Sequence, residues 1–134
     1  MKKAAAKIRK VARKPKGMLQ VKRVYASVSA DDGLRVLVDR LWPRGISKEK
    51  AKIDSWMKDV APSDALRKRF HGHPERWQDF KTAYAKELVQ DPAHTCLEEL
   101  HKQLSKSTVT LLYAARDEEH NNAVALKELL LRKK

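Results

Sequence analysis

Hydrophobic and polar residues alternate along some segments of the chain and recur at helical spacing in others, so the two patterns predict different elements. Residues 19–27 (LQVKRVYAS) alternate apolar with polar or basic residues, as expected of a half-exposed strand. Residues 34–42 (LRVLVDRLW) are rich in Val and Leu on both faces up to Asp39, which is typical of a strand covered on both sides in a parallel sheet. Residues 108–114 (TVTLLYA) predict another strand, and residues 56–61 predict a fourth.

Helical spacing and residues that favour helix starts indicate five helices between and after these strands. Apolar side chains three and four residues apart give the longer helices one face each for a core. Pro74 and Pro92 stand at first turns, and Asp117 is the expected cap of the last helix. The predicted helices cover residues 47–53, 63–72, 74–88, 92–104 and 117–131.

Strands that alternate with helices predict an α/β fold. We expect a small parallel or mixed sheet of three to four strands flanked by helices, in a Rossmann-like three-layer arrangement. A chain of 134 residues suits one domain, which we place at residues 18–134. Ligand sites in open sheets of this class lie outside the carboxyl ends of the strands. Polar residues that follow the predicted strands are therefore the candidates for chemistry.

The net charge of +13 is unevenly distributed along the chain. Residues 1–30 hold ten Lys or Arg and no acid, whereas residues 31–134 hold 20 basic and 17 acidic residues. We predict a flexible basic arm over residues 1–17, which would bind nucleic acid weakly and in a salt-dependent manner. Two alternatives stay open: Met18 is the native start, or the segment is a mitochondrial presequence.

Composition and motifs exclude several classes of function. Cys96 is the only cysteine, and no secretory signal or apolar run of about 20 residues is present, so we expect a cytoplasmic protein with no membrane partner. His71 and His73 have no third ligand at metal spacing. The chain also contains no glycine-rich phosphate-binding loop. We therefore expect neither a metal site nor a cofactor.

The first candidate segment is residues 39–45 (DRLWPRG), where a strand covered on both sides runs directly into charged residues. Arg40 and Arg44 are expected to clamp a phosphate or carboxylate, with Trp42 as a wall or stacking platform. Asp39 would orient an arginine or act as a base. The structural alternative is an ion pair between Asp39 and an arginine that only holds the bend, with Trp42 in the core.

The second candidate segment follows the strand at residues 108–114 and contains Arg116, Asp117, His120 and Asn121. Arg116 adds a positive charge at a helix start, where backbone N–H groups already favour an anion. Asp117 and His120 are three residues apart, so they are expected to meet as a pair for proton transfer. Asn121 would donate to or accept from the ligand. In the alternative, Asp117 only caps the helix.

Through these segments the chain resembles the YeaO-like branch of the domain of unknown function 488 family. The resemblance covers nearly everything from Val21 to Leu130. Its strongest stretches are RVLVDRLWPRGISKE at 35–49 and VTLLYAARDEEHNNAVAL at 109–126. The resemblance implies a small cytoplasmic bacterial α/β protein, and it implies no substrate or catalytic residue.

The leading hypothesis is a small enzyme, or a degenerate enzyme-like domain, that binds an anionic nucleotide-like or phosphorylated small molecule. Arg40, Arg44 and Arg116 would hold the anion, while Asp117 and His120 would transfer protons. One alternative is a nucleic-acid-binding accessory protein that uses the basic arm and helix surfaces such as residues 67–69 (RKR). The other is a protein-interaction module without a ligand. No residue pattern indicates an oligomeric state.

Overall fold

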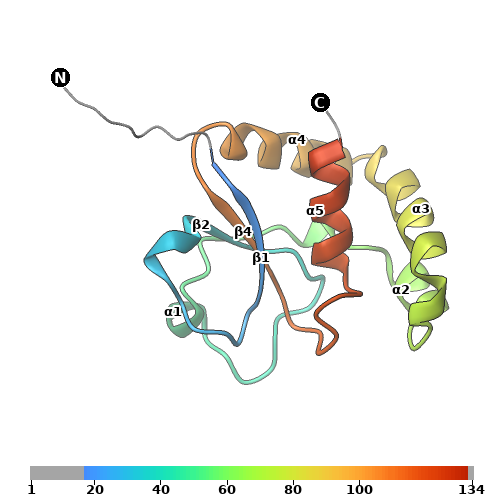
Figure 1. Ribbon diagram of the computed structural model, residues 1–134, viewed down its shortest axis with the longest axis horizontal. Helices are drawn as coiled ribbons and strands as arrows, with labels where there is room; N and C mark the ends of the chain where they lie inside the picture. The colour runs from blue at the N-terminus through green and yellow to red at the C-terminus, as the bar shows by residue number, and fades with distance from the viewer. Residues whose placement is uncertain (1–16, 133–134) are drawn as a thin grey trace.

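The computed structural model describes residues 17–132, which form a four-stranded sheet with helices on both sides (Figure 1). The strands are β1 (Leu19–Arg23), β2 (Leu34–Leu37), β3 (Ser55–Trp56) and β4 (Val109–Tyr113). The helices are α1 (Lys48–Ala51), α2 (Asp64–Phe70), α3 (Trp77–Leu88), α4 (Ala93–Leu104) and α5 (Asn122–Arg132). The predicted basic arm lies outside the described residues except for Gly17.

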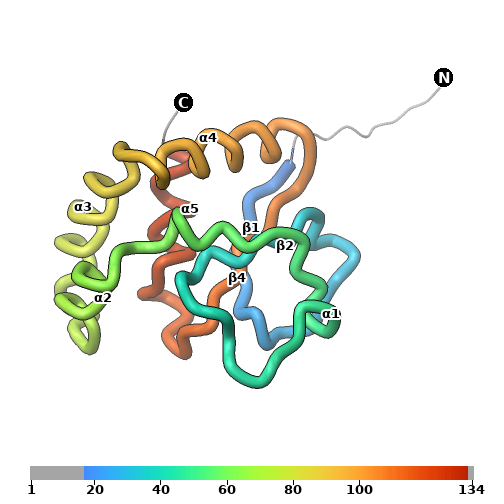
Figure 2. Tube along the Cα trace, turned by 180° about the vertical axis from the view of Figure 1, so that it is seen from behind, coloured from blue at the N-terminus to red at the C-terminus, as the bar shows by residue number. Residues whose placement is uncertain are grey.

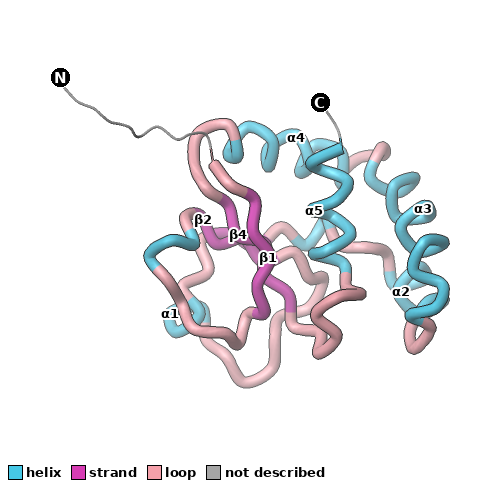
Figure 3. The backbone as a smooth tube through the Cα atoms, viewed as in Figure 1, coloured by secondary structure: helices cyan, strands magenta, loops and turns pink. Residues whose placement is uncertain are grey.

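The strand order is β1-β4-β2-β3, and every pairing is parallel. β4 lies between β1 and β2, and Val109 is in register with both Leu19 and Leu34. All five β4 residues are buried, which explains the apolar run in this segment. Since the strands run in one direction, their carboxyl ends meet at one edge of the sheet (Figure 3).

The sheet separates two layers, as the views from opposite sides show (Figures 1 and 2). Helices α2 to α5 pack on one face around the larger apolar cluster, which includes Tyr84, Leu111 and Leu126. Helix α1 and its flanking loops cover the other face, where Leu37 and Leu112 belong to a smaller cluster. The predicted α/β three-layer class is therefore confirmed. Within the described residues, no helix is long and apolar enough to cross a membrane.

Several strands are shorter than the alternation of residues predicts. β1 ends at Arg23 and β2 ends at Leu37, so the residues that follow are loops. The strand predicted at residues 56–61 is wrong beyond Trp56, because Lys58–Val60 forms a 3-10 turn. The Val60 amide donates to the Met57 carbonyl in that turn, and the buried hydroxyl of Tyr84 donates to the Val60 carbonyl. In this segment, hydrogen bonds within the turn and from the Tyr84 side chain take the place of hydrogen bonds to a neighbouring strand.

Candidate functional site

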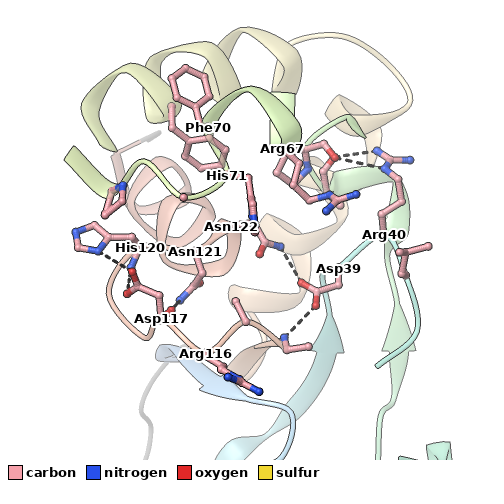
Figure 4. Close-up of a pocket in the computed structure, with 18 of the residues that line it drawn as sticks. Asp39, Arg40, Arg67, Phe70, His71, Arg116, Asp117, His120, Asn121 and Asn122 are labelled. Atoms are coloured by element: carbon pink, nitrogen blue, oxygen red, sulfur yellow. Dashed lines mark hydrogen bonds and ion pairs between the residues drawn. The ribbon is translucent and has the colours of Figure 1, made fainter. Parts of the chain in front are cut away.

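A cavity of about 770 Å³ lies where the loops after β2 and β4 meet helix α2 and the turn that follows it (Figure 4). Both segments predicted from the sequence border it, although Asp39 and Arg116 are 77 positions apart in the chain. All eight candidate residues line this cavity: Asp39, Arg40, Trp42, Arg44, Arg116, Asp117, His120 and Asn121. The convergence of the two segments follows from the parallel pairing of β2 with β4.

Asp39 joins the two strand ends at the base of the cavity (Figure 4). Its Oδ2 accepts the backbone N–H of Ala114 at 2.9 Å, directly after β4. Its Oδ1 accepts the side-chain amide of Asn122 at 3.0 Å, and that amide also donates to the Val38 carbonyl. Burial raises the pKa of Asp39, although these two donors and the positive charge of Arg67 act in the opposite direction.

Arg40 and Trp42 direct their polar groups toward the protein backbone. The Arg40 guanidinium donates to the Ala61 carbonyl at 3.0 Å and to the Pro62 carbonyl at 3.4 Å, so it holds the segment before α2. The Trp42 indole N–H donates to the Ile46 carbonyl at 2.8 Å, and its ring packs on the smaller apolar cluster. Among the described residues, no ion pair joins Asp39 to an arginine.

Asp117 forms a tight turn and does not cap the last helix, so that prediction is wrong. Its Oδ1 accepts the N–H groups of Glu119 and His120, each at 2.9 Å, and these bonds lower its pKa. Helix α5 begins at Asn122, and the residue before it supplies the cap. The expected contact between the carboxylate and the imidazole does form, with Asp117 Oδ2 at 3.1 Å from His120 Nδ1.

Asn121 uses both ends of its amide within the protein. Its Oδ1 accepts the N–H of Val124 at 2.9 Å, which is the bond of a helix cap, and its Nδ2 donates to the Asp117 carbonyl at 2.9 Å. The residue is only 6% exposed. This geometry argues against the expected role of Asn121 as a ligand contact, and it places the cap of α5 four residues after the predicted cap Asp117.

Three arginines keep side-chain donors available at the cavity. Within the described part of the chain, Arg44 and Arg116 make no side-chain hydrogen bond, and both side chains are exposed. Arg67 projects from α2, with Nη2 at 3.3 Å from Asp64 and half of its side chain exposed. Figure 4 shows Arg67 on the side of the cavity opposite Arg116, so positive groups border it from two directions.

Arg67 was predicted only as part of a basic helix surface over residues 67–69. In the structure the side chains of these three residues have different surroundings, because consecutive positions on a helix point in different directions. Arg67 lines the cavity, whereas the Arg69 guanidinium lies 5.1 Å from the centre of the Phe70 ring, and Lys68 is exposed elsewhere. Helical periodicity predicts that Leu66 and Phe70 face inward, but it does not predict that Arg67 borders the cavity.

Aromatic and imidazole side chains form the wall next to α3. Trp77 stacks on Phe80 with ring centres 5.6 Å apart, and the His120 and Trp77 rings form a T-shaped pair with their centres 5.2 Å apart. His71 and His73 also line the cavity, from the turn after α2. No set of three His, Cys, Asp or Glu residues suitable for a metal ion occurs in residues 17–132. The side chains that line the cavity carry guanidinium, imidazole, carboxylate, amide and aromatic groups.

Comparisons with known proteins identify relatives along nearly the whole described chain. A family model described as "Inactive DUF488-N3 subclade" matches residues 18–134. The uncharacterized protein Rv3073c of Mycobacterium tuberculosis is 44% identical over 112 residues, which cover 84% of this chain and 92% of the relative. The uncharacterized protein YeaO of Escherichia coli is 41% identical over 116 residues, which cover 84% of this chain and 96% of the relative. No solved structure matches significantly.

Proposed function

Because this chain belongs to the YeaO-like DUF488 family, within the group described as the inactive DUF488-N3 subclade, we propose that it binds an organic phosphate of nucleotide size without converting it. The observation that carries the proposal is the arginine-bordered cavity at the carboxyl ends of β2 and β4. Its volume of about 770 Å³ falls in the range of about 300 to 1,000 Å³ typical of small-molecule sites. An isolated phosphate ion would leave most of that space unfilled.

The charges of the lining favour an anion with two negative charges. The cavity is lined by four arginines and two aspartates, which leaves an excess of two positive charges when the histidines are neutral. Guanidinium groups bind phosphate oxygens through paired, charge-assisted hydrogen bonds. Arg44, Arg67 and Arg116 are the arginines that we assign to the ligand, since Arg40 is bonded to backbone carbonyls.

The internal bonds of the two carboxylates support binding without turnover. Both oxygens of Asp39 accept hydrogen bonds from the protein, and so do both oxygens of Asp117. Every oxygen of these two carboxylates thus already has a protein partner, which favours a structural role over that of a general base. In the described part of the chain, no Cys, Ser, Thr or Lys lines the cavity to serve as a nucleophile. We assign the predicted catalytic residues Asp39, Asp117 and His120 to holding the loops in place.

Calorimetric titration with adenosine 5′-monophosphate, pyrophosphate and inorganic phosphate tests this function. The wild-type protein is expected to bind the nucleotide most tightly, because only the nucleotide fills the cavity. Arg44→Ala is expected to weaken nucleotide binding about tenfold, which corresponds to the loss of one charge-assisted hydrogen bond of about 1.4 kcal/mol. ³¹P NMR of the same mixture is expected to show the nucleotide intact.

Arg132→Ala is the matched control, because Arg132 is exposed at the end of α5 and does not line the cavity. This variant is expected to bind the nucleotide as the wild type does. Equal affinities for Arg44→Ala, His120→Ala and the wild type would show that the cavity is not the binding site. Release of phosphate by the wild-type protein would refute the claim that the bound molecule is not converted.

A further inference from the structure

Arg23, at the end of β1, contacts the backbone of the loop after β4. The residue pattern of the sequence did not indicate this contact. Arg23 is the last residue of β1, and its guanidinium donates through Nε to the Ala115 carbonyl and through Nη2 to the Ala114 carbonyl, both at 2.9 Å. These carbonyls immediately precede Arg116. Arg23 therefore fixes the backbone from which Arg116 and the Asp117 turn extend.

Tyr25 makes the corresponding contact with the other loop. Its hydroxyl donates to the Arg44 carbonyl at 2.8 Å, and its ring lies beneath the Arg23 guanidinium, 5.0 Å from ring centre to Cζ. Tyr25 is 43% exposed and borders the cavity. The contacts form a continuous connection that runs from Arg44 through Tyr25 and Arg23 to the backbone before Arg116.

We infer that Arg23 and Tyr25 act as positioning residues that couple the two ligand-binding loops. The inference rests on the proposed function, since the loops carry Arg44 and Arg116. Asp39 already joins the loops at their bases, where the strands end. Arg23 and Tyr25 join them farther out, next to the arginines themselves. The site is then preorganised for a ligand that binds both arginines. When the ligand orders one loop, the entropic cost of ordering the other loop falls.

The test is a pair of double-mutant cycles measured by calorimetric titration with adenosine 5′-monophosphate. The pairs are crossed: Tyr25→Phe is combined with Arg116→Ala, and Arg23→Lys with Arg44→Ala. In each pair, the positioning residue contacts the backbone of one loop, and the replaced ligand-binding arginine lies on the other loop. Tyr25→Phe removes only a hydroxyl and is expected to weaken binding about threefold. The loss caused by Arg116→Ala is expected to be at least twofold smaller in the Tyr25→Phe background.

If the loss of affinity in each double variant equals the product of the losses in its two single variants, the coupling is refuted. Separate structural roles produce no interaction between the two positions. Arg132→Lys serves as the control for the arginine change, since Arg132 is exposed at the end of α5 and does not line the cavity. Arg132→Lys is expected to leave the affinity unchanged. Unfolding midpoints measured for every variant would separate loss of coupling from loss of the fold.

Amide exchange in the ligand-free protein keeps this inference testable if no nucleotide binds. The amides of Glu119 and His120 donate to Asp117 and report on the loop after β4. Tyr25→Phe is expected to speed their exchange at least twofold, although Tyr25 bonds to the other loop. Faster exchange without nucleotide binding would refute only the proposed function. Unchanged exchange, together with binding free-energy changes that simply add in both double-mutant cycles, would refute only the coupling.

Discussion

Asp39→Ala is expected to lower the free energy of unfolding by about 2 kcal/mol at neutral pH, because it removes both acceptors that join the strand ends. The Ala114 N–H would lose its partner, and the Asn122 amide would keep only the Val38 carbonyl; both bonds to Asp39 are partly buried. Asp39→Asn is expected to fall between this variant and the wild type. Its single oxygen satisfies one donor, while its NH₂ group faces the other. Urea unfolding of the three proteins measures the order.

The pH dependence of this loss follows from the raised pKa of Asp39. The folded protein binds the Asp39 proton more tightly than the unfolded chain does, so protonation contributes stability. That contribution is complete below the ordinary value of 3.8 and is lost as the pH rises through the higher folded pKa. Neither Asp39→Ala nor Asp39→Asn has this group. The difference between wild type and each variant is therefore expected to be larger at pH 3.5 than at pH 7.

Asp59→Ala provides the matched control, because Asp59 is an exposed aspartate that does not line the cavity. Its free energy of unfolding is expected to stay within about 0.5 kcal/mol of the wild type. The structural role of Asp39 would be contradicted by a variant Asp39→Ala as stable as this control. A difference between wild type and Asp39→Ala that grew with rising pH would contradict the assigned direction of the pKa shift.

Arg67→Glu is expected to weaken binding of adenosine 5′-monophosphate more than a hundredfold. The change removes one of the three arginines assigned to the ligand and places a negative charge beside the anion. Like charges in such proximity cost several kcal/mol, whereas a hundredfold loss requires only about 2.7 kcal/mol. Titration calorimetry at two salt concentrations measures the loss, which is expected to be smaller at the higher salt concentration.

The same variant has a second effect that needs no ligand. Arg67 currently favours the ionised form of Asp39, so its replacement by an acid is expected to raise the pKa of Asp39 further. NMR titration of the Asp39 carboxyl carbon measures this change. Lys68→Glu introduces the same charge change one residue along α2 and outside the cavity, and it is expected to affect neither quantity strongly. Equal effects of the two variants would mean that only the net charge matters.

The sequence predicted the part of the site that depends on strand direction. Asp39 and Arg116 each follow a strand rich in apolar residues, and parallel pairing brings the ends of such strands to one edge of the sheet. The two loops therefore converge as expected. Arg67, Tyr25 and Arg23 could not be placed in this way, because their roles depend on how α2 docks on the sheet and on contacts across loops.

The errors in the prediction have a common physical origin in competition among short-range hydrogen bonds. Asp117 and Asn121 are both residue types that cap helices, and the chain uses the second for α5 and the first for a preceding turn. Residues 58–60 likewise form a 3-10 turn where the pattern predicted a strand. Local preferences identify such candidates, but tertiary packing decides among them.

A crystal structure of the protein with adenosine 5′-monophosphate would show directly whether the arginine-bordered cavity binds the nucleotide. Intact nucleotide is expected in the cavity, with its phosphate oxygens within hydrogen-bonding distance of at least two of Arg44, Arg67 and Arg116. The loops after β2 and β4 would both contact the ligand. An empty cavity at saturating nucleotide, or nucleotide bound at another surface, would show that this cavity is not a nucleotide site.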